Sequence, residues 1–114
     1  MAWHHLFSGW GYALLTSGGL TSACPGGRVK TLSECSAAAR ALRLSDVTAQ
    51  DDGESGSSLD PPYCYFNKEL GWNLDSGIFT PYSISSLKFN SRGDNTGPCT
   101  TSNKCVCRVG TYFA

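Results

Sequence analysis

The stretch RGDNTGPC, residues 92–99, is the part of the sequence that most resembles known functional motifs. Its first three residues are the Arg-Gly-Asp tripeptide that integrins bind. Residues 93–98 resemble the Gly-Asp-Ser-Gly-Gly-Pro loop that holds the nucleophile of some serine proteases. Such an enzyme needs a hydroxyl nucleophile, a histidine base and a buried aspartate. Asn95 stands in the nucleophile's place, and an amide cannot be activated by loss of a proton, so this loop does not predict a protease.

Adhesion through Arg92-Gly93-Asp94 is the second interpretation of the same loop. The tripeptide follows an expected strand and precedes Cys99, so a bridged loop would present it. The order Arg-Gly-Asp-Asn is equally typical of a turn. We therefore predict a turn-forming loop whose glycine and asparagine serve the backbone geometry, and integrin-type adhesion remains the less favoured alternative.

A second candidate for chemistry is the acidic run Asp51-Asp52-Gly53-Glu54, because hard cations bind clustered carboxylates. The run lacks the length and alternating ligand spacing of an EF-hand, so we predict a solvated acidic loop instead. His4 and His5 lie at the extreme N-terminus. No nucleophile–base pair or metal cluster stands out along the chain. We expect a protein that is not an enzyme and has no metal or cofactor.

Cysteine is the most informative residue type. Six cysteines in a chain of 114 residues form an even set, which is typical of a disulfide framework made in an oxidising compartment. Zinc is the competing interpretation, but zinc sites usually need Cys-x-x-Cys pairs, and the chain offers only Cys105-x-Cys107. Three bridges at about 2–4 kcal/mol each would equal the net stability of a small domain. We expect an extracellular or cell-surface protein.

The pairing of the cysteines is open, because six allow 15 pairings and sequence alone does not choose. The scheme that we favour joins the start of the module to its last strand, locks a helix to a strand, and closes one tight ring. Its bridges are Cys24–Cys107, Cys35–Cys64 and Cys99–Cys105.

Composition excludes several partners. The formal net charge is +0 and only 16% of residues are charged, so the chain lacks the basic face that a nucleic acid requires. No apolar run approaches the roughly 20 residues that span a bilayer. The first residues, MAWHHLFSGWGYALLTSGG, have no basic n-region and no unbroken apolar stretch, unlike a signal peptide. We expect either that a leader is missing or that Met1 is not the biological start.

The clearest secondary-structure signal is a helix over about residues 31–44. Thr31 and Glu34 form a capping box, in which each side chain accepts from the other residue's backbone N–H. Alanine and leucine, strong helix formers, follow. A shared face is predicted from spacings of three and four for Leu32, Cys35, Ala39 and Leu42.

Short strands are predicted around this helix, at residues 11–16, 63–67, 86–90 and 104–109. In the third, Leu87 and Phe89 should face inward. Polar, turn-rich residues predict a mobile loop over 50–62, and a further loop is expected to hold Trp72, Pro81 and Tyr82. The fold class is therefore α+β: a small disulfide-stabilised domain over residues 11–114, with one helix packed on a small, mostly antiparallel sheet.

Exposed aromatic residues are the best candidates for binding. They could stack on sugar rings or contribute to a protein interface. Trp72 has a further interpretation as a lid over the small core. Residues 1–10 form an apolar N-terminal segment that would fold back, move freely or dock on a neighbouring copy, the last giving an open assembly. The candidate interface or glycan-stacking residues are Trp3, Phe7, Trp10, Trp72 and Tyr82.

Several motifs recur in an order that resembles a known group of proteins. They are YALLTSG, LSECSAAARAL, DPPYCYF, LKFN and GPCTTSNKCVCR, and they cover roughly residues 12 to 108. The chain resembles the small cysteine-rich modules of predicted secreted and surface proteins of algal protists. That resemblance implies an extracellular building block and carries no established activity or catalytic residue.

Three functions follow as expectations. The first is a non-enzymatic structural module that builds a surface coat, hair or fibre through contacts with its own copies or related extracellular proteins. The second is a carbohydrate-binding module that uses exposed aromatics. The third is an accessory subunit on the lumenal side of an algal membrane complex. Glycans would be bound or O-linked, because no Asn-x-Ser/Thr sequon occurs.

Overall fold

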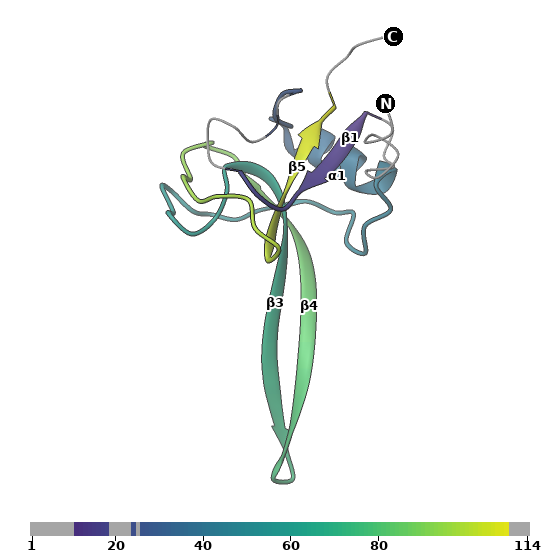
Figure 1. The fold of residues 1–114 in the computed structure, drawn as a ribbon, viewed down its shortest axis with the longest axis vertical. Helices are drawn as coiled ribbons and strands as arrows, with labels where there is room; N and C mark the ends of the chain where they lie inside the picture. Colours follow the sequence, from purple (N-terminus) through teal and green to yellow (C-terminus); the bar gives the residue numbers. More distant parts are fainter. Residues whose placement is uncertain (1–10, 19–23, 25, 110–114) are drawn as a thin grey trace.

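The computed structural model describes residues 11–18, 24 and 26–109. This part of the chain forms one helix and a five-stranded sheet of order β1-β5-β3-β4-β2 (Figure 1). Of the strands described, only β2 and β4 pair in parallel, so the α+β prediction with a mostly antiparallel sheet is confirmed. The elements are β1 (Tyr12–Leu15), α1 (Leu32–Ala41), β2 (Gln50–Asp51), β3 (Tyr63–Asp75), β4 (Ile78–Asn90) and β5 (Asn103–Arg108).

Helix α1 begins as the sequence predicts. The Thr31 hydroxyl accepts from the Glu34 backbone N–H at 3.1 Å, which satisfies one free donor of the first turn. The other half of the expected capping box is wrong. The Glu34 carboxylate instead accepts from the Arg108 guanidinium at 2.6 and 2.8 Å and from the Tyr12 hydroxyl at 3.1 Å. Glu34 therefore joins the helix to β5 and β1.

The helix is shorter than the predicted 31–44. It ends at Ala41 because Arg43 adopts a left-handed conformation, with φ of 58°, and turns the chain away. The Leu42 N–H still bonds to Ala38, and the Leu44 N–H bonds to Ala39, which satisfies the last helical carbonyls. The predicted helix face holds in the middle but fails at its start, where Leu32 is 44% exposed.

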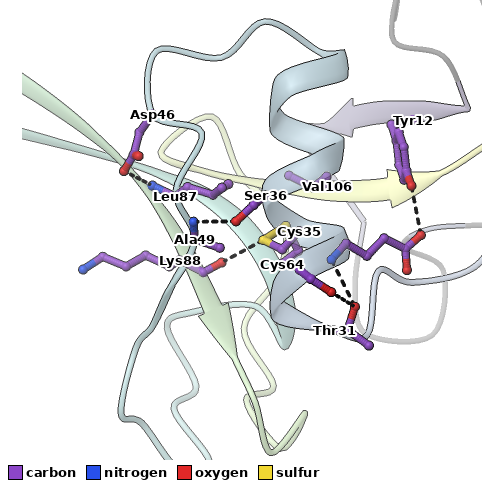
Figure 2. The surroundings of a disulfide bond; sticks show 12 residues. Tyr12, Thr31, Cys35, Ser36, Asp46, Ala49, Cys64, Leu87, Lys88 and Val106 are labelled. Carbon is purple, nitrogen blue, oxygen red and sulfur yellow. Dashed lines mark hydrogen bonds between the residues drawn. A yellow bond between two sulfur atoms is a disulfide. The ribbon is translucent and has the colours of Figure 1, made fainter.

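The core lies between α1 and one face of the sheet. Cys35 of the helix bonds to Cys64 of β3, and Leu87 of β4 lies beside this bridge (Figure 2). Leu87 and Phe89 are both buried in this core, as expected. The Asp46 carboxylate accepts from the Leu87 N–H, and the Ser36 hydroxyl accepts from the Ala49 N–H. The remaining buried members of this core are Val29, Ala38, Ala39, Ala49 and Val106.

Two disulfides cover the opposite face of the sheet. Successive side chains of a strand point to opposite faces. Cys105 and Cys107 therefore share a face, and both are about 1% exposed. They bond to Cys99 and Cys24 respectively, and these four residues form a second buried cluster.

The three disulfides are thus Cys24–Cys107, Cys35–Cys64 and Cys99–Cys105, the same pairs that the sequence analysis favours. They close loops with sequence separations of 83, 29 and 6 residues. All six cysteines are buried, while the helix contributes mainly alanine to the core. Covalent bridges therefore compensate for a core with few large side chains.

One prediction is wrong in an important way. The expected loop that would hold Trp72, Pro81 and Tyr82 is a regular hairpin instead. The strands expected at 63–67 and 86–90 continue to Asp75 and start at Ile78, so that β3 and β4 pair over 13 residues each. Gly71, Pro81 and several polar residues resemble loop signals, but in the structure each fits a position along a two-stranded ladder.

We predict that the two disulfides on the face of the sheet opposite the helix, Cys24–Cys107 and Cys99–Cys105, contribute unequally to stability. In the chain-entropy model the long Cys24–Cys107 loop is worth about 4–5 kcal/mol and the short Cys99–Cys105 loop about 2 kcal/mol. The double variant Cys24→Ser/Cys107→Ser should lower the free energy of unfolding, measured in urea, by more than the double variant Cys99→Ser/Cys105→Ser. They are matched controls for burial, since all four sulfurs lie in one cluster. Equal losses, or the reverse order, would contradict the model.

Candidate functional site

The most unusual feature of the molecule is the part of the β3–β4 hairpin that leaves the body. β5 pairs with β3 only from Tyr65 to Asn67. The last hydrogen bond on this edge of β3 runs from the Lys68 N–H to the Ser102 carbonyl, just before β5 begins. Beyond this point, residues 68–75 and 78–85 and the turn between them project as a two-stranded arm (Figure 1). We call this segment the hairpin arm. Its eight residues per strand extend about 25 Å.

The tip of the hairpin arm has the turn chemistry that a tight hairpin requires. Ser76 and Gly77 are the two loop residues, with φ of 53° and 83°. Positive φ at both positions defines a type I′ turn, whose twist matches that of the flanking strands. Asp75-Ser76-Gly77 is therefore the sequence signal for this hairpin.

One face of the hairpin arm is apolar. Directly paired residues of an antiparallel ladder share a face, so Trp72 lies with Pro81 and Leu74 lies with Phe79. This is the same face that α1 covers in the body, because Cys64, Leu87 and Phe89 have the same strand parity. The apolar arm face consists of Leu70, Trp72, Leu74, Phe79 and Pro81.

These side chains are open to water. Leu70, Trp72, Leu74 and Phe79 are 73%, 65%, 63% and 65% exposed, and Trp72 and Phe79 together line a shallow hollow. Each of these side chains exposes on the order of 100–170 Å² of surface. Together they make an apolar patch of about 500 Å². The largest apolar patches of ordinary monomers reach this size, and such patches are often functional. The alternative that Trp72 closes the core does not fit its place on the arm.

The other face of the hairpin arm is mixed. Asn73, Tyr82 and Ile84 line a second shallow hollow there, and the Tyr82 ring lies over Gly71, where a Cβ would come within 2.3 Å of it. Tyr82 thus covers the one position of β3 in the arm that has no side chain. Trp72 and Tyr82 consequently point to opposite faces, and the structure does not bring these two candidates together. Trp3, Phe7 and Trp10 lie outside the described residues.

A second notable region lies at the body, where the loops at 52–61 and 90–95 meet. Asn95 is fully buried, and its side-chain amide donates to the Asp52 carboxylate and to the Pro61 carbonyl, at 3.2 and 3.1 Å. Its side-chain oxygen accepts from the Ser57 N–H at 2.9 Å. The residue at the nucleophile-like position of the sequence motif is thus a structural clamp between two loops.

Carboxyl groups surround this clamp. The pKa of Glu54 is raised to about 7, first by a hydrogen bond with the Asp60 carboxyl, then by partial burial and by the charges of Asp60 and Asp52. The Tyr65 hydroxyl donates to Asp52 at 2.7 Å, and burial and that bond raise the pKa of Tyr65. Among the described residues, no group of histidine, cysteine or acidic side chains is arranged to hold a metal ion.

The Arg-Gly-Asp tripeptide forms a turn beside this region. Gly93 has φ of 66° and its N–H bonds to the Asn90 carbonyl, while the Tyr63 ring lies against its Cα. Arg92 and Asp94 are exposed, and the Asp94 carboxylate accepts from the Ser55 hydroxyl at 2.9 Å. The turn prediction is therefore correct, and Asp94 is held against the neighbouring loop.

Comparison with known proteins identifies no relative of this chain. The chain matches no family model, no curated protein and no solved structure. None of the helices that the structure describes has the length and apolar character needed to cross a membrane.

We predict that the clamp makes stability depend on pH. Because the folded pKa of Glu54 is near 7 and its ordinary value is 4.5, the folded state holds an extra proton between these values. Its stabilising effect is complete below about pH 4.5 and is lost as the pH rises through 7. The melting temperature should fall by about 2–5 °C between pH 5 and pH 8.

The control for this prediction is Glu54→Gln, whose amide donates to Asp60 at every pH. Its melting temperature should be nearly flat over the same window. The carboxyls of Glu34, Asp51 and Asp94 do not interfere, since their pKa values are lowered from ordinary values that already lie below this window. A wild-type curve that stays level or rises from pH 5 to pH 8 would show that Glu54 is ionised throughout.

Proposed function

We propose that the protein is a non-enzymatic extracellular structural module, a building block of a surface coat, hair or fibre, and that the hairpin arm makes its protein contacts. The observation that supports this proposal is the apolar arm face, which continues the face covered by α1 but has no described element over it. A two-stranded hairpin is marginally stable alone in water, and a third strand or a covering layer stabilises it. A partner surface would supply that layer.

The body of the molecule suits a durable outer structure. Three intramolecular disulfides are consistent with an oxidising compartment, and two of them close one face of the sheet where a larger protein would place a second layer. The resemblance to small secreted modules remains a prediction that points the same way. A rigid, cross-linked body with one projecting arm is a geometry from which repeating assemblies can be built.

Carbohydrate binding is the second candidate function, and the exposed ring of Trp72 is the observation that favours it. An aromatic face stacks on a sugar ring, but a specific sugar site also needs convergent polar groups. The hollow at Trp72 is lined by Phe79, whereas Asn73 and Tyr82 line the hollow on the opposite face. Assembly through protein contacts therefore fits the apolar arm face better.

We predict that removing the apolar arm face abolishes assembly without unfolding the body. The double variant Trp72→Ser/Phe79→Ser should remain monomeric in sedimentation velocity, while the wild type forms oligomers or filaments visible by electron microscopy. The control is Leu59→Ser, which removes a side chain that is 79% exposed on a loop of the body, and it should assemble like the wild type. A wild-type protein that stays monodisperse and is retained on glycan columns would favour the carbohydrate alternative.

A further inference from the structure

We infer that two copies of this chain pair through the free edge of β3 in the hairpin arm, antiparallel and related by a two-fold axis, to form a four-stranded sheet. This inference rests on the proposed function and names its partner, a second copy, and the backbone atoms that join the two copies. It is carried by the direction of the N–H groups along the hairpin arm, by the position of Pro81 and by the charges that flank the free edge.

The hydrogen-bonding groups of the β3 edge follow from two observed contacts. The Lys68 N–H points away from β4, because it donates to Ser102 on the β5 side. Every second residue of a strand points its N–H the same way. Leu70, Trp72 and Leu74 therefore present their N–H and C=O groups to the edge of β3 that faces away from β4, and no described strand pairs with that edge beyond Asn67.

The β4 edge is different. The Leu87 N–H donates to Asp46, away from β3, so Phe79, Pro81, Ser83 and Ser85 have the same outward orientation. Proline has no N–H, so it costs the hairpin no ladder bond at this position but prevents another strand from pairing there. The hairpin arm thus has one closed edge and one open edge.

Charge and space select the register of the pair. β5 occupies the β3 edge as far as Lys68, so the tip of a partner arm must stop near Glu69. A two-fold axis at Trp72 would place Glu69 opposite Asp75 of the second copy, two like charges in direct contact. An axis at Asn73 avoids this contact and places each Trp72 opposite the other copy's Leu74.

In this register the segment is complementary to itself. Trp72 and Leu74 exchange two main-chain hydrogen bonds on each side of the axis, and the two Asn73 side chains meet across it. Gly71 lies opposite Asp75, so no like charges face each other. The net charge of +0 adds no long-range repulsion between copies. The apolar faces of both arms then lie side by side on a sheet of four strands, which is stable where two are marginal.

The test compares two proline variants at paired positions. Leu74→Pro removes the Leu74 N–H, which in each copy donates one hydrogen bond to the other copy. Phe79→Pro removes the outward N–H of the residue that pairs with Leu74 on β4. Both replace an exposed apolar side chain of the same face and spare the hairpin ladder. Each variant loses one side chain of the apolar arm face, so that loss is common to both. We expect Leu74→Pro to weaken dimerisation ~10–100-fold more than Phe79→Pro in sedimentation equilibrium, because only Leu74→Pro also loses two hydrogen bonds per dimer.

A second measurement uses the wild-type chain and does not depend on how the variants fold. Amide hydrogen exchange should slow at Trp72 and Leu74 as the protein concentration rises, while the amides of Phe79 and Ser83 stay fast at every concentration. Protection at Phe79 and Ser83 instead, or at neither pair in a sample that has assembled, overturns pairing through β3.

The outcomes separate the two proposals. If assembly occurs and Leu74→Pro behaves like Phe79→Pro, pairing through the edge is overturned, while contacts through the apolar arm face stand. If Trp72→Ser/Phe79→Ser also assembles normally, the proposed role of the hairpin arm is overturned as well. A wild type that is monomeric at all concentrations overturns both.

Discussion

The Cys35–Cys64 disulfide is the contact on which the rest of the structure depends. It joins α1 to the base of β3, and the helix then covers Leu87 and Phe89 of the paired strand. The helix brings mostly alanine to this interface, so apolar burial alone would hold it weakly. With the helix fixed by a covalent bond, the chain needs little of its hairpin for the core. The remaining half of that hairpin is left to extend into solvent.

Local signals predicted the body well. The Thr31 cap and the alanine-rich run that follows specify α1, and the alternation around Leu87 and Phe89 specifies the buried end of β4. These signals involve neighbouring residues, so they can be recognised in a linear sequence. The end of the helix could not be recognised in this way. Arg43 adopts a left-handed conformation that nothing in its residue type demands.

The candidate site could not be predicted for a different reason. Gly71 and Pro81 are typical of loops, and their roles appear only when the opposite strand is in place. Tyr82 covers the glycine, and the proline occupies a position whose N–H would face outward. Asn95 likewise joins residues from 52 to 61 that lie far away in the sequence. Contacts of this kind depend on register, and register depends on the whole sheet.

Pro81 also has a consequence for how far such an assembly can grow. Sheets with two open edges recruit further strands without limit, which is the route to cross-β amyloid. A hairpin with a proline on one edge can pair with a further strand only at its other edge. When two such hairpins have paired, each outer edge of the joined sheet carries a proline. If copies pair through β3 as proposed, Pro81 protects an exposed, apolar β-structure against unlimited growth through its edges, and any longer polymer must be built through its faces.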